Sequence, residues 1–125
     1  MRHRSTPAVA RVLAPLSLAV LVFAGCASPE PNEAQKASDL LTKALVAQSS
    51  GNPTLASHYY NNVLDFDPRN RIAYFNLGLI AQTQGSWSAA ETNFLLTLSI
   101  DPGFPPARSS LVKLEAAHPE VRVTH

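Results

Sequence analysis

Between residues 34 and 117, apolar side chains fall into five stretches, and short turns of glycine, proline and small polar residues separate the stretches. Within a stretch the apolar side chains recur every three or four residues, which is the spacing of one helix face. No proline interrupts the interior of a stretch. We therefore predict an all-α chain with helices over about residues 34–49, 53–66, 71–83, 87–99 and 105–117.

The turns indicate where these helices begin and end. Gly51 and Gly85 suit the left-handed conformation that often follows the last turn of a helix. Asn52, Asn70 and Ser86 each precede a predicted helix, and their side chains can accept a hydrogen bond from the first turn of that helix. Each of the second and fourth stretches is followed by Asp-Pro, at 67–68 and 101–102, and a proline there prevents the helix from continuing.

The same pattern occurs twice, with every matching pair 34 residues apart. The pairs are Ala44 and Gly78, Ala47 and Ala81, Gly51 and Gly85, Ala56 and Ala90, Tyr60 and Phe94, Leu64 and Leu98, Asp67 and Asp101, and Pro68 and Pro102. Small residues let two antiparallel helices approach closely. We therefore expect Ala44 to pack against Ala56, and Gly78 against Ala90, because larger side chains would force strain.

This period and pattern resemble the tetratricopeptide repeat (TPR). The resemblance gives a first repeat over 37–70, a second over 71–104 and a capping helix over 105–117, inside a domain over 36–118. The first repeat departs from the family at Lys43, where leucine is usual. The implied fold is an all-α, TPR-like solenoid of two helix-turn-helix repeats plus a C-terminal capping helix. Residues 119–125 are expected to be a frayed tail, and Trp87 is expected to pack between repeats.

In TPR proteins the first helix of each repeat lines a concave surface that binds other proteins. Carried onto this chain, that surface comprises Leu41, Leu45, Gln48, Ile72, Phe75, Asn76, Leu79 and Gln82. Ile72, Phe75 and Leu79 form a second apolar stripe on their helix, available either to a partner or to the last helix of the chain. A clamp for a terminal carboxylate is disfavoured because Leu41 and Leu45 replace its polar residues, although Asn76 matches. An apolar peptide or an amphipathic helix is the expected ligand.

The N-terminal segment has the pattern of an export signal. Arginines at 2, 4 and 11 precede a 13-residue apolar run, Val12–Ala24, which is too short to span a bilayer. The sequence Ala24-Gly25-Cys26 resembles the lipobox of bacterial lipoproteins, although Phe23 stands where leucine is usual. The resemblance implies a signal peptide over 1–25, lipid attachment (including palmitate) at Cys26 and a flexible tether over 26–35. An uncleaved membrane anchor is the alternative.

Composition excludes several classes of function. The chain has 10 basic and 9 acidic residues, and removal of 1–25 leaves 7 basic and 9 acidic, so bulk positive charge for nucleic acid is lacking. A single cysteine excludes a disulfide framework and a multi-cysteine metal site. His58 and Asp65 are seven residues apart and beyond direct contact on one helix. We therefore predict no catalytic residues, no metal site, no cofactor and no enzyme activity.

The resulting hypothesis is a bacterial envelope lipoprotein that acts as a scaffold for a protein partner through its TPR surface. We expect it to be exported and lipid-anchored to the cell membrane or outer membrane, facing the periplasm or the cell exterior; Ala27 after the cysteine slightly favours the outer membrane. Two repeats are fewer than the three that stable stacks usually need, so a homo-oligomer joined at exposed repeat ends is a second hypothesis. An assembly factor of the pilotin type, for a secretion or pilus machine, is a third.

Overall fold

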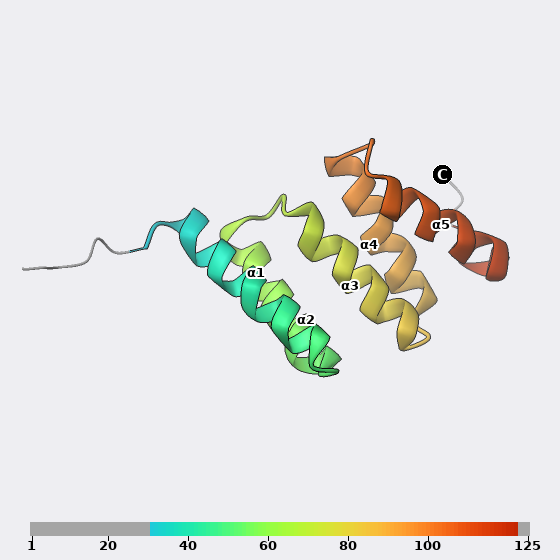
Figure 1. Cartoon of the computed structure of the whole chain (residues 1–125). Coiled ribbons are helices and arrows are strands. Elements are labelled where there is room, and N and C mark those ends of the chain that lie inside the picture. Colours follow the sequence, from blue (N-terminus) through green and yellow to red (C-terminus); the bar gives the residue numbers. More distant parts are fainter. Residues whose placement is uncertain (1–30, 123–125) are drawn as a thin grey trace, which may run out of the picture.

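A computed structural model describes residues 31–122 and shows five α-helices followed by one short 3₁₀ turn (Figure 1). The helices are α1 (Glu33–Ser49), α2 (Pro53–Phe66), α3 (Arg71–Thr83), α4 (Trp87–Ile100) and α5 (Pro105–Ala117), and the turn η1 covers Pro119–Val121. Each predicted helix is present, and every boundary agrees within one residue. The signal peptide, Cys26 and the first half of the tether (26–30) lie outside the described residues, as do residues 123–125, and the last three tether residues, 33–35, belong to α1.

The helices pack as consecutive antiparallel pairs. α1 pairs with α2 and α3 pairs with α4, while α2 against α3 joins the two pairs and α5 lies against α4. The described residues contain no β-strand. The predicted fold class is therefore confirmed: this is a short, TPR-like helical repeat with a C-terminal helix.

The turns adopt the predicted conformations. Gly51 and Gly85 have φ of 74° and 73°, in the left-handed region that favours glycine. Asn52 accepts a hydrogen bond from the backbone N–H of Leu55 at 3.1 Å, and Asn70 caps α3 in the same way. Ser86 occupies the N-cap of α4, but its side chain makes no capping hydrogen bond.

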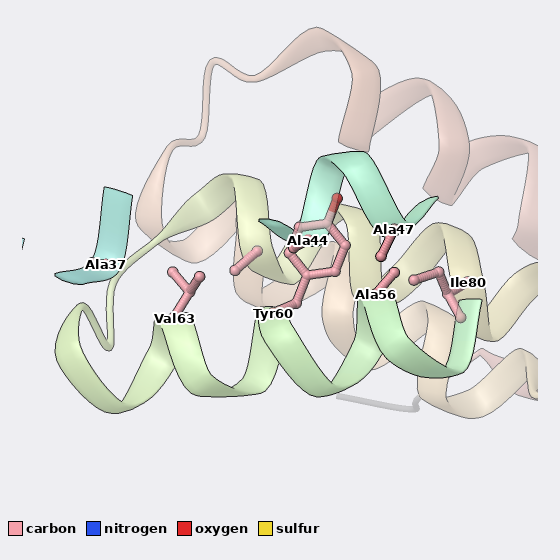
Figure 2. Close-up of a cluster of buried hydrophobic side chains, with 8 residues drawn as sticks. Ala37, Ala44, Ala47, Ala56, Tyr60, Val63 and Ile80 are labelled. Carbon is pink, nitrogen blue, oxygen red and sulfur yellow. The ribbon is translucent and has the colours of Figure 1, made fainter. Parts of the chain in front are cut away.

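Small side chains bring the helices of the first pair together. Ala44 on α1 and Ala56 on α2 are fully buried, beside the buried ring of Tyr60 (Figure 2). Ile80 on α3 reaches the same cluster, which ties the second repeat to the first. The Tyr60 hydroxyl donates a 2.6 Å hydrogen bond to Gln48 Oε1, and burial raises the pKa of Tyr60 to about 12.

In the second pair an aromatic ring packs on the glycine that lets the helices approach. Gly78 on α3 lies against the ring of Phe94 on α4. A Cβ atom at position 78 would lie 2.6 Å from Cε1 of Phe94 and 2.7 Å from Cδ1. Phe94 thus fills the space that the missing side chain of Gly78 leaves.

The C-terminal segment is ordered further than predicted. Val121 in η1 is buried, and Arg122 lies 3.8 Å from Glu115. Trp87 does not lie between the two repeats: its ring stacks on His118 with 4.0 Å between ring centroids. Residues 119–122, expected to belong to a frayed tail, are therefore ordered: the turn η1 lies against α4 and α5 and buries Val121.

Candidate binding groove

A line of three side chains runs along one face of α1 between two surface hollows. Leu41, Leu45 and Gln48 are spaced four and three residues apart, which places them on a single helix face. We call them the α1 stripe. Leu45, in the middle, is 45% exposed. A leucine this accessible between two hollows is available for contact with another molecule.

The first hollow lies at the beginning of α1 and has a volume of about 440 Å³. Leu41 lines it together with Ala37 and with Phe66 at the end of α2. Lys36 lies 5.8 Å from the centre of the Phe66 ring, a cation–π contact that helps to hold this ring in place. Acidic and amide side chains also line the hollow: Glu33, Asp67 and Asn70.

The second hollow lies at the end of α1 and has a volume of about 240 Å³. Gln48 lines it together with Leu79 and Thr83 of α3. Because Gln48 Oε1 accepts the hydrogen bond from Tyr60, its side chain is held by the core of the first repeat. The α1 stripe and the two hollows together form what we call the inner groove.

Other predicted groove residues are committed to the interior. Phe75 packs with its ring centre 5.9 Å from that of Phe94 and 5.3 Å from that of Phe104. Its side chain therefore belongs to the cluster that joins α3, α4 and the start of α5. The apolar stripe predicted on α3 is thus partly covered by other parts of the same chain. This is the alternative to its being covered by a partner protein.

Asn76 is also unsuited to holding a ligand. It is only 9% exposed, and its Nδ2 donates a 2.9 Å hydrogen bond to the carbonyl of Ile72 in its own helix. Ile72 and Gln82 are half-buried and line neither hollow of the inner groove. Of the predicted groove residues on α3, Leu79 alone lines one of the two hollows.

The sequence did not identify Phe66, Asp67 and Asn70 as groove residues. They lie in or beside the turn between α2 and α3, and it is the packing of that turn beside α1 that brings them to the first hollow. Their helix-ending and capping functions were recognisable from sequence, but their position at a binding surface depends on tertiary structure.

Among residues 31–122, no group of three or more histidine, cysteine, aspartate or glutamate side chains could bind a metal ion. His58 is exposed, and its Nε2 atom lies 3.2 Å from the side-chain nitrogen of Asn62. Over the same residues, no helix is long and apolar enough to cross a membrane.

Comparison with known proteins gives one informative relative. The chain is 34% identical over 105 residues to the "Tetratricopeptide repeat and J domain-containing co-chaperone DNJ1" of Fusarium oxysporum f. sp. lycopersici. The match covers 83% of this chain but only 20% of the relative, so this chain spans about a fifth of that protein's length. No protein-family model matches the chain. The similarity agrees with the TPR-like fold and concerns only a part of the fungal protein.

Proposed function

We propose that this chain is a protein-interaction module that binds a segment of another protein in the inner groove. The exposed Leu45 between the two hollows carries this proposal, because an accessible apolar anchor flanked by pockets suits an apolar peptide or one face of an amphipathic helix. The TPR-containing relative supports a protein as the partner.

The inner groove favours apolar contact over charge. The α1 stripe and Leu79 are uncharged, and acidic side chains, Glu33 and Asp67, line the first hollow but not the second. Salt screens interactions between exposed charges and acts little on apolar burial. Binding in this groove should therefore change little between low and physiological salt.

Replacing Leu45 should remove binding without removing the fold. An apolar anchor at the centre of an interface often contributes more than about 2 kcal/mol, so Leu45→Glu should weaken binding of the partner by roughly thirtyfold or more. The measurement is capture of the partner by the full chain, with the circular-dichroism melting curve recorded in parallel. Val112→Glu is the matched control, because Val112 is 62% exposed and lies on α5, away from the groove.

Unchanged capture by Leu45→Glu would exclude the inner groove as the binding surface. Equal loss in both variants would also count against it, because a general effect of a new surface charge would then explain the result.

We further propose that the protein is tethered to a membrane by lipid on Cys26. The proposal rests on the arginine-rich start, the 13-residue apolar run and the Ala24-Gly25-Cys26 sequence. Stable anchoring takes two or more acyl chains, which a diacylglyceryl group supplies. In such a protein the tether would position the inner groove near the membrane surface, where the module would act as a scaffold.

Cys26→Ser should leave the protein unprocessed or released from the membrane fraction, because serine lacks the thiol that forms the thioether. Mass spectrometry of the mature wild-type N-terminus gives the direct measurement: a diacylglyceryl-modified Cys26 is expected. An unmodified Cys26 in the mature protein would refute the lipid anchor and leave the interaction module unaffected.

A further inference from the structure

Three side chains from distant parts of the sequence meet where η1 lies against α4. The imidazole of His118, which follows α5, stacks on the indole of Trp87 at the start of α4, with 4.0 Å between the ring centroids and 17° between the ring planes. The Nδ1 atom of His118 lies 3.1 Å from Oε1 of Glu120 in η1. We call these three residues the C-terminal latch. Its histidine contacts an aromatic face and a carboxylate at once, and the His118 side chain is 28% exposed.

The turn that the C-terminal latch holds is weakly bonded by itself. The backbone N–H of Val121 donates to the carbonyl of His118 at 3.1 Å, and that of Arg122 donates to the carbonyl of Pro119 at 3.4 Å. The second distance exceeds the range of about 2.7–3.2 Å that is usual for such bonds. Arg122 also pairs with Glu115 at 3.8 Å, but its side chain is 67% exposed, and exposed pairs contribute little. One added interaction in the latch can therefore change how often η1 opens.

Acidic side chains predominate around the C-terminal latch. Glu120 is in direct contact with His118, and Glu115 lies nearly one turn before His118 on α5. The charged residue of α4 is Glu91, which is buried one turn after Trp87 on the same face of that helix. The basic side chains of α5 and of the residues described after it are Arg108, Lys113 and Arg122. A proton on His118 would thus enter a mainly acidic environment.

We propose that the C-terminal latch responds to pH and holds η1 more tightly when His118 is protonated. The neutral ring stacks on Trp87 and can donate one hydrogen bond from Nδ1 to Glu120. The protonated ring adds an ion pair with the Glu120 carboxylate and a cation–π contact with the indole, which is the best of the aromatic partners for a cation. Both additions require η1 to be in place, so protonation and closure of the turn favour each other.

The direction of the response follows from which form is charged. An unperturbed histidine loses its proton at about pH 6.5, and above that range closure of η1 loses both the ion pair and the cation–π contact. On the acidic side, a backbone hydrogen bond and the neighbouring His118 hold the pKa of Glu120 below its usual value. The carboxylate therefore stays charged while the histidine titrates. Closure is strongest at mildly acidic pH and weaker above neutrality.

Opening of η1 would enlarge an apolar surface at this end of the stack. A hollow of about 340 Å³ lies beside the C-terminal latch, and Trp87, Ala89 and Val121 are among the side chains that line it. When η1 leaves α4, the indole face beneath His118 and the buried side chain of Val121 join this hollow. None of the latch residues lines the inner groove. The response to pH therefore does not depend on the proposed binding of a partner.

Accessibility of Trp87 to acrylamide in the full wild-type chain tests the proposal. Trp87 is the single tryptophan of the chain, and acrylamide is uncharged, so pH does not alter its attraction to the protein. The bimolecular quenching constant, obtained from fluorescence lifetimes, should rise between about pH 5 and 8. We expect the open fraction to grow by roughly two- to fivefold, the effect of one exposed cation–π contact. A constant that is independent of pH, or that is higher at acidic pH, would overturn the proposal.

Three variants show which side chains carry the response. His118→Phe keeps a stacked ring that cannot take a proton, so its quenching constant should not change with pH. Glu120→Gln keeps a hydrogen-bond acceptor on an exposed side chain and removes the charge, so its response should be smaller than that of the wild type. His58→Gln changes an exposed histidine on α2 and should respond as the wild type does.

Circular dichroism at each pH verifies that the compared variants are folded. A response that persists in His118→Phe, that remains complete in Glu120→Gln, or that disappears in His58→Gln would contradict the latch.

Discussion

Phe94→Ala should reduce the free energy of unfolding by about 3–5 kcal/mol, because it empties the centre of the second helix pair. Phe94 is fully buried, and its ring lies against the backbone of α3 at Gly78. Gly78→Ala should be destabilising for the complementary reason: the new methyl group would lie 2.6 Å from Cε1 of Phe94, so the ring has to move. Overpacking of this kind costs about 1–3 kcal/mol.

A double-mutant cycle distinguishes this contact from a general sensitivity of α3. Alanine is favoured over glycine in a helix interior by about 1 kcal/mol. Gly78→Ala should therefore become neutral or stabilising in a Phe94→Leu background, which removes the edge of the ring and keeps a large apolar side chain. Denaturant unfolding of the wild type, the two single variants and the double variant gives the coupling energy between positions 78 and 94. Additive effects would show that Phe94 is not the group that requires glycine at position 78.

Phe75→Ala should lower the free energy of unfolding by roughly 2–3 kcal/mol. This is less than the loss expected for a fully buried phenylalanine, because the Phe75 side chain is only half-buried. The loss has two sources: the apolar contacts with the second core cluster, and the aromatic pairs with Phe94 and Phe104. The midpoint of thermal or denaturant unfolding measures it.

Leu45→Ala provides the comparison for Phe75→Ala, because both residues were predicted to line the groove. Leu45 is 45% exposed, so its truncation should change stability little. If Phe75→Ala instead leaves the unfolding midpoint unchanged and weakens partner binding, Phe75 belongs to the binding surface and the packing described above is incorrect.

The helix boundaries were predictable because local chemistry determines them. Gly51 and Gly85 have the positive φ that ends α1 and α3, and Asn52 and Asn70 accept the capping hydrogen bonds of α2 and α3. The period of 34 residues then indicated which helices pair. These features depend on residues close in sequence, or on a repeat that the sequence itself displays.

The side-chain environment of the candidate site was less predictable, because it depends on contacts across the stack. Phe75 and Leu45 are both apolar residues predicted to lie on the concave face, yet Phe104, beyond the second repeat, packs on Phe75, whereas Leu45 is 45% exposed. Asn76 matched a family position, but its amide bonds to the carbonyl of its own helix. Val121 gave no periodic signal, and it is buried through tertiary contact alone.

Site-specific photo-crosslinking in cells tests the central claim, that the inner groove binds another protein. The full chain would carry a photo-reactive phenylalanine analogue in place of Leu45, with the same replacement at Val112 as the control. We predict a distinct adduct with another protein from position 45 and none from position 112, although Val112 is the more exposed residue. The absence of an adduct from position 45, or the same adducts from both positions, would contradict the assignment of the groove.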